Sequence, residues 1–166
     1  DKRDRLSLLS APFDGDFTPL WESELRMNGV MWGDEDLAMG WTWRWNDRLL
    51  RTWVLDPSGE SEPKVMNERS FQDNYSDPGS PLSWPGPYGR NVIHQVDGDI
   101  LLSGAGIRPD GVRPFLDRMN VETGETRTIW RAGDSHHETL TAVVDAEAKT
   151  LITRRQSLSD PPNYMR

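Results

Sequence analysis

The sequence predicts an all-β fold made of repeated four-stranded antiparallel units, like the blades of a β-propeller. Three observations predict it. Apolar and polar residues alternate along most of the chain, and turn-forming Gly, Pro, Asn and Asp recur roughly every eight to twelve residues. Convincing amphipathic helical patterns are absent. A strand–turn–strand unit also recurs, with Gly59 and Gly124 at equivalent positions about 65 residues apart, at the long end of the spacings typical of blades.

The repeated unit has two clear copies. The first covers residues 36–40, 51–60 and 64–66, and the second covers residues 99–103, 115–125 and 128–130. Weaker copies flank them: residues 6–21 resemble the outer half of an earlier blade, and residues 145–153 resemble the inner half of a later one. Each clear copy contains a turn in which Gly supplies a positive φ and Asp, Pro or Thr begins the reversal.

These copies define the expected domain organisation. We expect the blade parts at about 1–24, 25–70, 90–132 and 138–166, all within one β-propeller domain. That makes about three blades, whereas closed propellers need roughly four to eight. We therefore expect an incomplete propeller that is a fragment of a larger ring. An open arc would expose apolar blade faces, so its expected partners are the remaining blades or further copies of the same chain through self-association.

Two connections are expected to be long. Residues 71–89 are rich in Gly and Pro, which disfavours a regular strand and predicts an ordered loop or cross-over. A linker with a domain boundary there is the alternative, although Phe71, Tyr75, Trp84 and Tyr88 favour packing over free solvation. Residues 104–114 are expected to form a hairpin tip that extends over one mouth of the ring.

Composition excludes several classes of function. A formal net charge of −8 disfavours binding to a phosphate backbone, so no nucleic-acid partner is expected. Cysteine is absent, so a disulfide framework is excluded, and cysteine usage does not distinguish a cytoplasmic from a periplasmic location. No apolar run approaches the roughly 20 residues that a membrane-spanning helix requires.

One aromatic row is a candidate binding surface. Trp41, Trp43 and Trp45 alternate along an expected strand, which places three indoles on one face where they could stack on a base, a sugar or a peptide. Packing between blades is the favoured interpretation, because propeller sheets bury both faces. Three nearby arginines could attract an acidic ligand, although solvated strand ends are the favoured interpretation: Arg44, Arg48 and Arg51.

Residues 134–138 contain the most reactive side-chain types in the chain. His136, His137 and Glu138, with Asp134 before them, carry zinc-ligating groups, but neighbours on an extended segment point apart and the helical i, i+4 spacing is missing. Ser135 beside His136 does not predict a catalytic pair either, because a serine nucleophile requires a base oriented by a third group. We expect no metal ligand in this segment.

Other catalytic patterns are also missing. Residues 133–137 fail the last position of the G-x-S-x-G nucleophile elbow, and residues 103–106 lack the Lys and following helix of a phosphate-binding loop. Two carboxylates could flank a glycosidic bond, but nothing selects a pair. The acidic residues at turns and strand edges are expected to form turns or solvated caps: Asp36, Asp99, Asp117 and Glu125. The sequence thus predicts no catalytic residue and no cofactor in this chain.

Several motifs together resemble a known family. Residues 51–54, 75–80, 101–106, 111–117 and the pairs 123–124 and 129–130 are similar in order and spacing to the amino-terminal propeller of glutamyl endopeptidases, which are serine peptidases of the prolyl oligopeptidase family. The resemblance covers about residues 32–162. It implies a two-domain enzyme in which a propeller, usually seven-bladed, covers an α/β-hydrolase domain that carries the catalytic Ser, Asp and His.

What the resemblance implies for this chain is a lid and substrate filter without hydrolytic activity of its own. Its partners would be the peptide substrate, the missing α/β-hydrolase domain and the remaining blades. No residue here matches the catalytic residues of that family. A non-catalytic propeller module that binds protein or carbohydrate through Trp41, Trp43 and Trp45 is the alternative. A propeller glycosidase is a third, and it would require a carboxyl group with a raised pKa.

Overall fold

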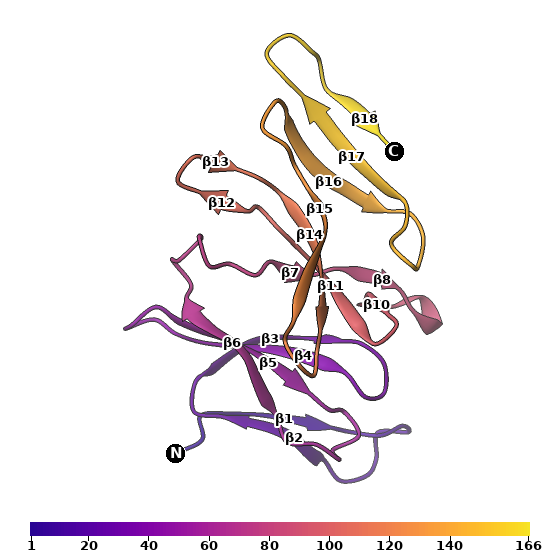
Figure 1. Cartoon of the computed structure of the whole chain (residues 1–166). Helices are drawn as coiled ribbons and strands as arrows, with labels where there is room; N and C mark the ends of the chain where they lie inside the picture. Colours follow the sequence, from indigo (N-terminus) through magenta and orange to yellow (C-terminus); the bar gives the residue numbers. More distant parts are fainter. The chain divides into compact units, whose positions relative to one another are not determined.

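A computed structural model describes residues 1–166 and shows an all-β protein, as the sequence predicts. The strands form several small antiparallel sheets, and the one helical segment is the short 3₁₀ turn η1 at Pro87–Gly89. The chain divides into two compact units, Asp1–Gln72 and Asp73–Arg166. Figure 1 labels the strands of both units. The structure contains no helix with the length and hydrophobicity of a membrane span.

The first unit contains a hairpin and a four-stranded sheet. The hairpin pairs β1 (Asp4–Leu8) with β2 (Thr18–Ser23). The sheet has the strand order β3-β4-β5-β6, a meander in which each strand pairs with its sequence neighbour. Its strands are β3 (Arg26–Trp32), β4 (Ala38–Arg44), β5 (Leu49–Leu55) and β6 (Lys64–Ser70). This arrangement follows from the short turns between the strands, because antiparallel neighbours need only a hairpin connection.

The core of the first unit centres on a buried tryptophan. Trp21, Ala38 and Leu55 form the buried cluster, and the Trp53 ring lies against the Trp21 ring at a centroid distance of 5.5 Å. Gly40 is required here because a Cβ at this position would lie 2.6 Å from Trp21 Cζ3. The β1–β2 hairpin and the sheet are therefore packed together through one large indole.

The second unit is built around a five-stranded antiparallel sheet. Its strand order is β10-β11-β14-β15, and β7 also pairs with β11. These strands are β7 (Ser80–Pro81), β10 (Gln95–Val96), β11 (Asp99–Gly104), β14 (Phe115–Asn120) and β15 (Thr126–Arg131). The register of β11 on β14 is continuous from the Asp99–Asn120 pair to the Gly104–Phe115 pair.

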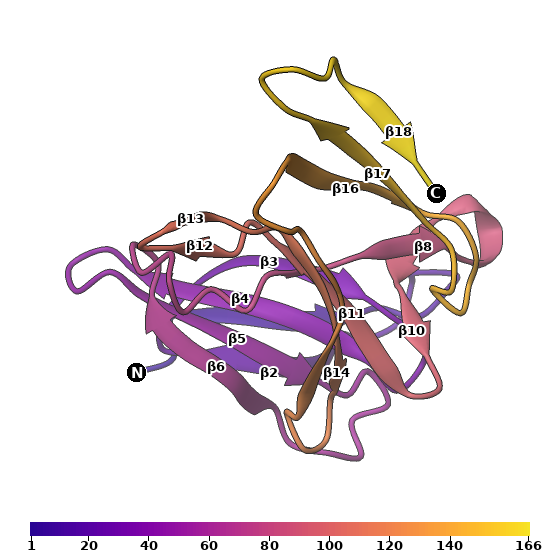
Figure 2. The same ribbon diagram turned by 45° about the horizontal axis from the view of Figure 1, so that its top comes forward.

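Three smaller sheets complete the second unit. A three-stranded sheet has the order β16-β17-β18, and its strands are drawn in orange to yellow in Figures 1 and 2. The strands are β16 (His137–Val143), β17 (Leu151–Gln156) and β18 (Asn163–Met165). Two short hairpins pair β8 (Ser83–Pro85) with β9 (Asn91–Ile93) and β12 (Ile107–Arg108) with β13 (Gly111–Val112).

The core of the second unit joins two of its sheets. Leu101 and Leu116, both fully buried, pack with Val96 and Ala148. Partly buried apolar side chains surround them: Leu82, Trp130, Leu140, Val143 and Leu151. Because these residues come from β10, β11, β14 and β15 as well as from β16, β17 and their turn, the two sheets bury one shared apolar surface.

The predicted turns of the two repeated units have the same chemistry. Gly59 has φ +77° and Gly124 has φ +75°, the left-handed region that Gly adopts without steric cost. In the first turn the Asp56 carboxylate accepts hydrogen bonds from the backbone N–H groups of Ser58 and Ser61. In the second turn Asn120 Oδ1 accepts hydrogen bonds from the backbone N–H groups of Glu122 and Thr123. A polar side chain thus caps the turn before each Gly.

The Pro-rich segment differs in part from the expected loop. It contains β7 and β8, two short strands where none was expected. Pro81 lies opposite Leu102 on the edge of β11, and the neighbouring Leu82 N–H donates to Leu101 O at 2.9 Å. Edge positions tolerate Pro because its missing N–H removes no ladder bond that the sheet needs. Further on, residues 104–114 contain the β12–β13 hairpin, as the sequence predicts.

Candidate functional site

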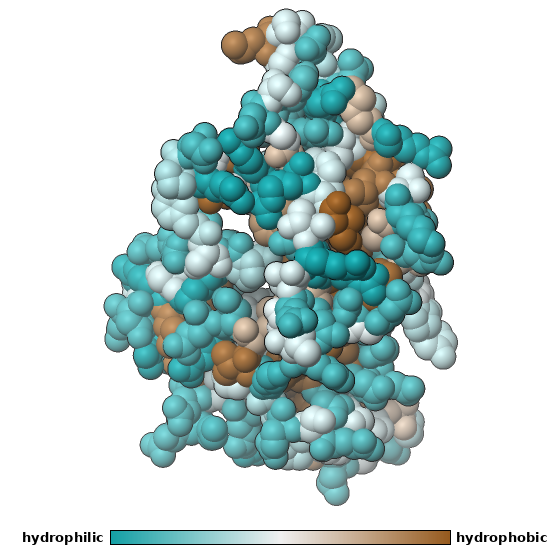
Figure 3. All heavy atoms as spheres, in the orientation of Figure 1, coloured by the Kyte–Doolittle hydropathy of each residue, from teal (hydrophilic) through white to brown (hydrophobic).

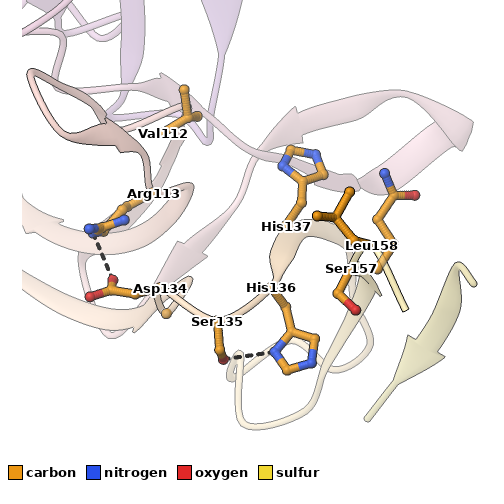
Figure 4. Close-up of a pocket in the computed structure, with 10 residues that line it drawn as sticks. Val112, Arg113, Asp134, Ser135, His136, His137, Ser157 and Leu158 are labelled. Atoms are coloured by element: carbon orange, nitrogen blue, oxygen red, sulfur yellow. Dashed lines mark hydrogen bonds and ion pairs between the residues drawn. The ribbon is translucent and has the colours of Figure 1, made fainter. Parts of the chain in front are cut away.

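A cleft of the second unit lies beside the β12–β13 hairpin. It has a volume of about 470 Å³ and is lined by residues from three places: the end of the hairpin, the connection between β15 and β16, and the turn that follows β17. Figure 4 shows Arg113 and Asp134 on one side, Ser157 and Leu158 on the other, and Ser135 and His136 between them. Ligand-sized pockets in proteins have volumes of roughly 300–1,000 Å³, so a short peptide segment would fit.

The local backbone places Arg113 at the cleft. Its N–H donates to Gly106 O at 3.0 Å, which closes the base of the β12–β13 hairpin. Gly106 has φ +59°, and a Cβ there would lie 1.9 Å from Arg113 O. No other residue type fits without moving this backbone, because L side chains disfavour this conformation and the space is already occupied. The hairpin base is therefore fixed by a glycine.

The Arg113 guanidinium is held by two carboxylates. Nη2 donates to Asp110 Oδ2 at 3.0 Å, and Nε forms an ion pair with Asp134 Oδ1 at 3.0 Å. The Arg113 side chain is 19% exposed, whereas those of Asp110 and Asp134 are 67% and 79% exposed. A guanidinium has five N–H donors, so these two contacts leave donors for a further acceptor. The contact with Asp134 shows that a carboxylate can form an ion pair with the Arg113 side chain.

Ser135 and His136 are closer to a catalytic arrangement than the sequence indicated. Ser135 Oγ lies 2.8 Å from His136 Nδ1, a normal hydrogen bond. His136 Nε2 lies 3.8 Å from Asp160 Oδ2, too far for a hydrogen bond that would orient the ring. Asp160 Oδ2 instead accepts from Ser157 Oγ at 2.9 Å. The third group that a serine–histidine pair requires is thus engaged elsewhere.

The two neighbouring histidines do not converge. His136 and His137 point in different directions in Figure 4, as expected for adjacent residues on an extended backbone. Nowhere in the chain do three or more His, Asp or Glu side chains gather in a way that could hold a metal ion. Among the polar side chains that line the cleft, Asp134 is the one that can only accept hydrogen bonds when ionised, and the others can donate: Arg113, Ser135, His136, His137, Gln156 and Ser157.

The aromatic row of the first unit is only partly as predicted. Trp41 and Trp43 lie on β4, but Trp45 lies beyond its end in the turn to β5, so the three indoles do not form one straight row on a strand. Trp45 instead folds against Trp43, with ring centroids 6.0 Å apart and nearly perpendicular planes. The reason is that the chain reverses at residues 45–48, which ends the alternation of the strand.

Phe71 completes this aromatic cluster, and sequence reasoning missed that role. Its ring lies 6.1 Å from Trp43 and 5.7 Å from Trp45, and the Arg48 guanidinium lies 4.2 Å above the Trp45 ring. The Phe71 N–H also donates to Arg48 O at 2.7 Å. Trp45 is 60% exposed, so the cluster formed by Trp43, Trp45, Arg48 and Phe71 presents an aromatic face to solvent.

The four acidic residues that the sequence analysis considered have different environments. Asp99 accepts from Arg118 Nε at 2.7 Å and from Asn120 Nδ2 at 3.0 Å, and these bonds lower the pKa of its carboxyl group. Asp117 lies within β14 and not at a turn; its buried Oδ1 has no hydrogen bond and lies 3.9 Å from Arg131 Nη2. Asp36 and Glu125 lie just before β4 and β15.

The clearest pKa shifts of carboxyl groups are all downward. The Asp47 carboxyl, bonded to Arg44, has its pKa lowered to about 2. Hydrogen bonds within turns lower the pKa of Asp56, mainly from Ser58, and that of Asp145, mainly from the Lys149 N–H. A glycosidase needs a general acid with a pKa shifted in the opposite direction. These groups therefore stabilise turns and do not suit proton donation.

Comparison with known proteins places the chain among regions of peptidase-related proteins. It is 32% identical over 160 residues to the probable chloroplastic glutamyl endopeptidase of Oryza sativa subsp. japonica, and 30% identical over 161 residues to that of Arabidopsis thaliana. Each alignment covers 87% of this chain and 17% of the relative. The chain thus spans about a sixth of the length of the relatives that it matches. No protein-family model matches it.

Proposed function

We propose that this chain forms part of the β-propeller of a serine peptidase of the prolyl oligopeptidase family that cleaves peptides after Glu. The observation that carries the proposal is the similarity over 87% of the chain to proteins named as glutamyl endopeptidases. The fold supports it, because a four-stranded, a five-stranded and a three-stranded antiparallel sheet are compatible with successive blades. The chain acts in this proposal as a lid and substrate filter.

The filter works by size. A ring of packed sheets leaves a narrow passage, through which an extended peptide passes and a folded protein does not. The chemistry then takes place on the α/β-hydrolase domain, where a serine attacks the scissile carbonyl, an acyl-enzyme forms, and backbone N–H groups stabilise the oxyanion. The residues of this chain exclude large substrates and take no part in bond cleavage.

The filter role is tested on the protein expressed from its full reading frame. A blocked peptide reporter with one Glu is compared with a folded protein that carries the same sequence in a surface loop. We expect turnover of the peptide and no cleavage of the folded protein. Equal cleavage of both would contradict the filter role. The reading frame itself tests the family assignment, since a G-x-S-x-G elbow is expected downstream.

The absence of hydrolytic activity in this chain is tested with two preparations. The purified 166-residue chain is expected to give no serine-directed turnover of acyl-Glu reporters. In the full-length protein, Ser135→Ala is expected to leave kcat/KM unchanged, because no carboxylate orients His136. A loss of a hundredfold or more in the Ser135→Ala variant would identify Ser135 as a nucleophile and refute this part of the proposal.

A non-catalytic binding module is the second candidate, and the exposed cluster of Trp43, Trp45, Arg48 and Phe71 favours it. Exposed indoles beside a guanidinium suit stacking on a sugar ring or an aromatic side chain. Tryptophan fluorescence with oligosaccharides separates the two candidates. A saturable change in the wild type that is lost in Trp45→Ala, together with a reading frame without a catalytic elbow, would favour the module.

A further inference from the structure

We propose that a small cleft on the β17–β18 hairpin binds a free α-amino acid, whose carboxylate contacts Arg155 and whose ammonium group contacts Asp160. The two strands lie side by side in Figures 1 and 2, and His136 from the β15–β16 connection also lines the cleft. Its volume is about 210 Å³. Pockets for drug-sized ligands have volumes of roughly 300–1,000 Å³, so this cleft suits a smaller molecule. A free amino acid contains no peptide bond, so the proposal goes beyond peptide cleavage and does not depend on it.

The first argument is the Arg155 guanidinium, which has no carboxylate partner. The residue is partly buried on β17, and its side chain makes one polar contact, from Nη2 to the Met165 sulfur at 3.7 Å. A thioether sulfur is a weak acceptor. Glu138 lies opposite Arg155 in the register of β16 and β17, but its Oε1 accepts from Thr153 Oγ1 and it forms no ion pair with the guanidinium. Because charged groups that are withdrawn from water are normally paired, a ligand carboxylate would supply the partner that Arg155 lacks.

The second argument is the Asp160 carboxylate, which lines the same cleft. The turn that carries it is fixed, because Ser157 N–H donates to Asp160 O and Asp160 N–H donates to Ser157 Oγ, both at 3.1 Å. Asp160 Oδ2 accepts from Ser157 Oγ at 2.9 Å and lies 3.8 Å from His136 Nε2. Its Oδ1 makes no polar contact within the protein, and Asp160 forms no ion pair with Arg155. The second carboxylate oxygen is therefore available to a ligand.

The two charges together select the class of ligand. A simple anion would be attracted by Arg155 and repelled by Asp160, and a simple cation would meet the reverse. A free α-amino acid carries a carboxylate and an ammonium group on one carbon, so it can satisfy both side chains at once. Two amides and two apolar side chains complete the lining: Gln156, Asn163, Pro161 and Met165. The apolar pair offers contact to an aliphatic side chain, and a thioether adapts its shape readily. These features favour an amino acid such as leucine.

The test uses the protein from the full reading frame, treated with a fluorophosphonate so that any reactive serine is blocked. Three probes are titrated at pH 7 and followed by calorimetry: L-leucine, N-acetyl-L-leucine, which lacks the ammonium charge, and L-leucinamide, which lacks the carboxylate. We expect L-leucine to bind about tenfold or more tightly than either derivative, because each derivative loses one charge-assisted contact. Equal affinity for the three probes, or no binding of L-leucine, would overturn the proposal.

A pair of arginine variants assigns the carboxylate to this cleft. Arg155→Gln is expected to reduce the affinity for L-leucine to that for L-leucinamide, which stays unchanged. Arg154→Gln is the matched control: Arg154 is the preceding residue of β17 and is also partly buried, but it does not line the cleft, since successive side chains of a strand point to opposite faces. The control is expected to retain the wild-type affinities. If Arg155→Gln also retains them, the carboxylate binds elsewhere and the proposal is wrong.

Asp160→Asn tests the ammonium contact and keeps the proposal testable even if Arg155→Gln fails to fold. The amide oxygen can still accept from Ser157, but the negative charge is gone. We expect the affinity for L-leucine to fall about tenfold and that for N-acetyl-L-leucine to stay the same or rise, because the repulsion of its carboxylate is removed. A fall by the same factor for both probes would show that Asp160 is only structural and would overturn the proposal. These affinities are measured without turnover, so they are independent of the peptidase assignment.

Discussion

The sheet β3–β6 and the sheet β10–β11–β14–β15 have the same plan but differ in one connection. Both contain four strands paired in chain order, to which the second sheet adds β7 on β11, and both have a capped turn with a positive-φ Gly between the third and fourth of these strands. The second and third strands of the first sheet are joined by the tight turn 45–48. The equivalent connection of the second sheet, residues 105–114, contains the β12–β13 hairpin. The difference shows that the sheet is a scaffold and that this connection is where the two copies diverge.

Each connection creates a different surface. The short turn brings Trp45 and Arg48 against Trp43 and Phe71 and forms an exposed aromatic face. The long connection carries Arg113 to the wall of a cleft. Loops on a rigid scaffold commonly carry binding residues, because they vary without cost to the core. On the surface shown in Figure 3 hydrophilic side chains predominate, as the charge content of the chain implies.

The largest expected effect is on the free energy of unfolding, when a core side chain of either unit is truncated. Leu116→Ala in the second unit and Leu55→Ala in the first remove side chains that are no more than 1% exposed. Each variant is expected to lose about 2–5 kcal/mol of unfolding free energy, because both leave a cavity. Urea denaturation measures the loss. Val112→Ala, at an exposed position, is the control, and a loss below about 1 kcal/mol in either core variant would contradict the prediction.

A glycine pair sharpens the difference between the two kinds of connection. Gly106→Ala is expected to cost roughly 2–4 kcal/mol, because the new Cβ meets Arg113 O and φ is positive. Gly98→Ala also has a positive φ, of +81°, but nothing lies within 4 Å of its Cβ, so about 1–2 kcal/mol is expected. Thermal denaturation compares them. Equal losses would show that the hairpin base is not fixed as described.

Equivalence of the repeated turns is tested by Gly59→Ala and Gly124→Ala. Both glycines have open space at the Cβ position, so the cost comes from φ alone and is expected to be about 1–2 kcal/mol in each case. Calorimetry of the two single variants gives the values. If one substitution is neutral and the other is not, the two turns are not equivalent and the repeat is weaker than the strand order indicates.

The smallest expected effect is the loss of the Arg44–Asp47 interaction at the turn 45–48 when the pH is lowered. Arg44 lowers the pKa of the Asp47 carboxyl from 3.8 to about 2. A lowered pKa in the folded state means that the interaction stabilises the turn above pH 3.8 and is lost as the pH falls through about 2. The carboxyl carbon of Asp47 is followed by NMR. Arg44→Gln is expected to return the midpoint toward 3.8, and an unchanged midpoint would exclude Arg44 as the cause.

Local features of the fold were predictable from the sequence, and long-range ones were not. The all-β class and the positive φ of Gly59 and Gly124 depend on residues near one another in sequence. The position of Trp45 was mispredicted because strand ends are set by the turn and not by alternation. Pairing of Pro81 with Leu102 depends on a neighbouring edge that the sequence does not reveal.

The candidate site was largely hidden for the same reason. Arg113, Ser135 and Ser157 come from three separate segments, so only the packing of the second unit brings them to one cleft. The contact between Ser135 and His136 depends on side-chain rotamers, which a neighbour relation in sequence does not specify. One signal was present: Asp134 and His136 lie in the connection between β15 and β16, and His137 begins β16. This signal identified one segment of the cleft but not the two other segments that line it.

The buried His94 limits where this protein can be truncated. Its ring stacks on Trp84 at 4.4 Å, and its Nε2 lies 2.7 Å from Ala146 O in the turn between β16 and β17. A carbonyl can only accept, so Nε2 carries the proton. Removal of the sheet β16–β18 would leave the Nε2 donor without its acceptor and expose Leu101 and Leu116 to solvent. A fragment that contains only one of these two sheets is therefore not expected to fold. A boundary for expression is better placed between residues 72 and 73.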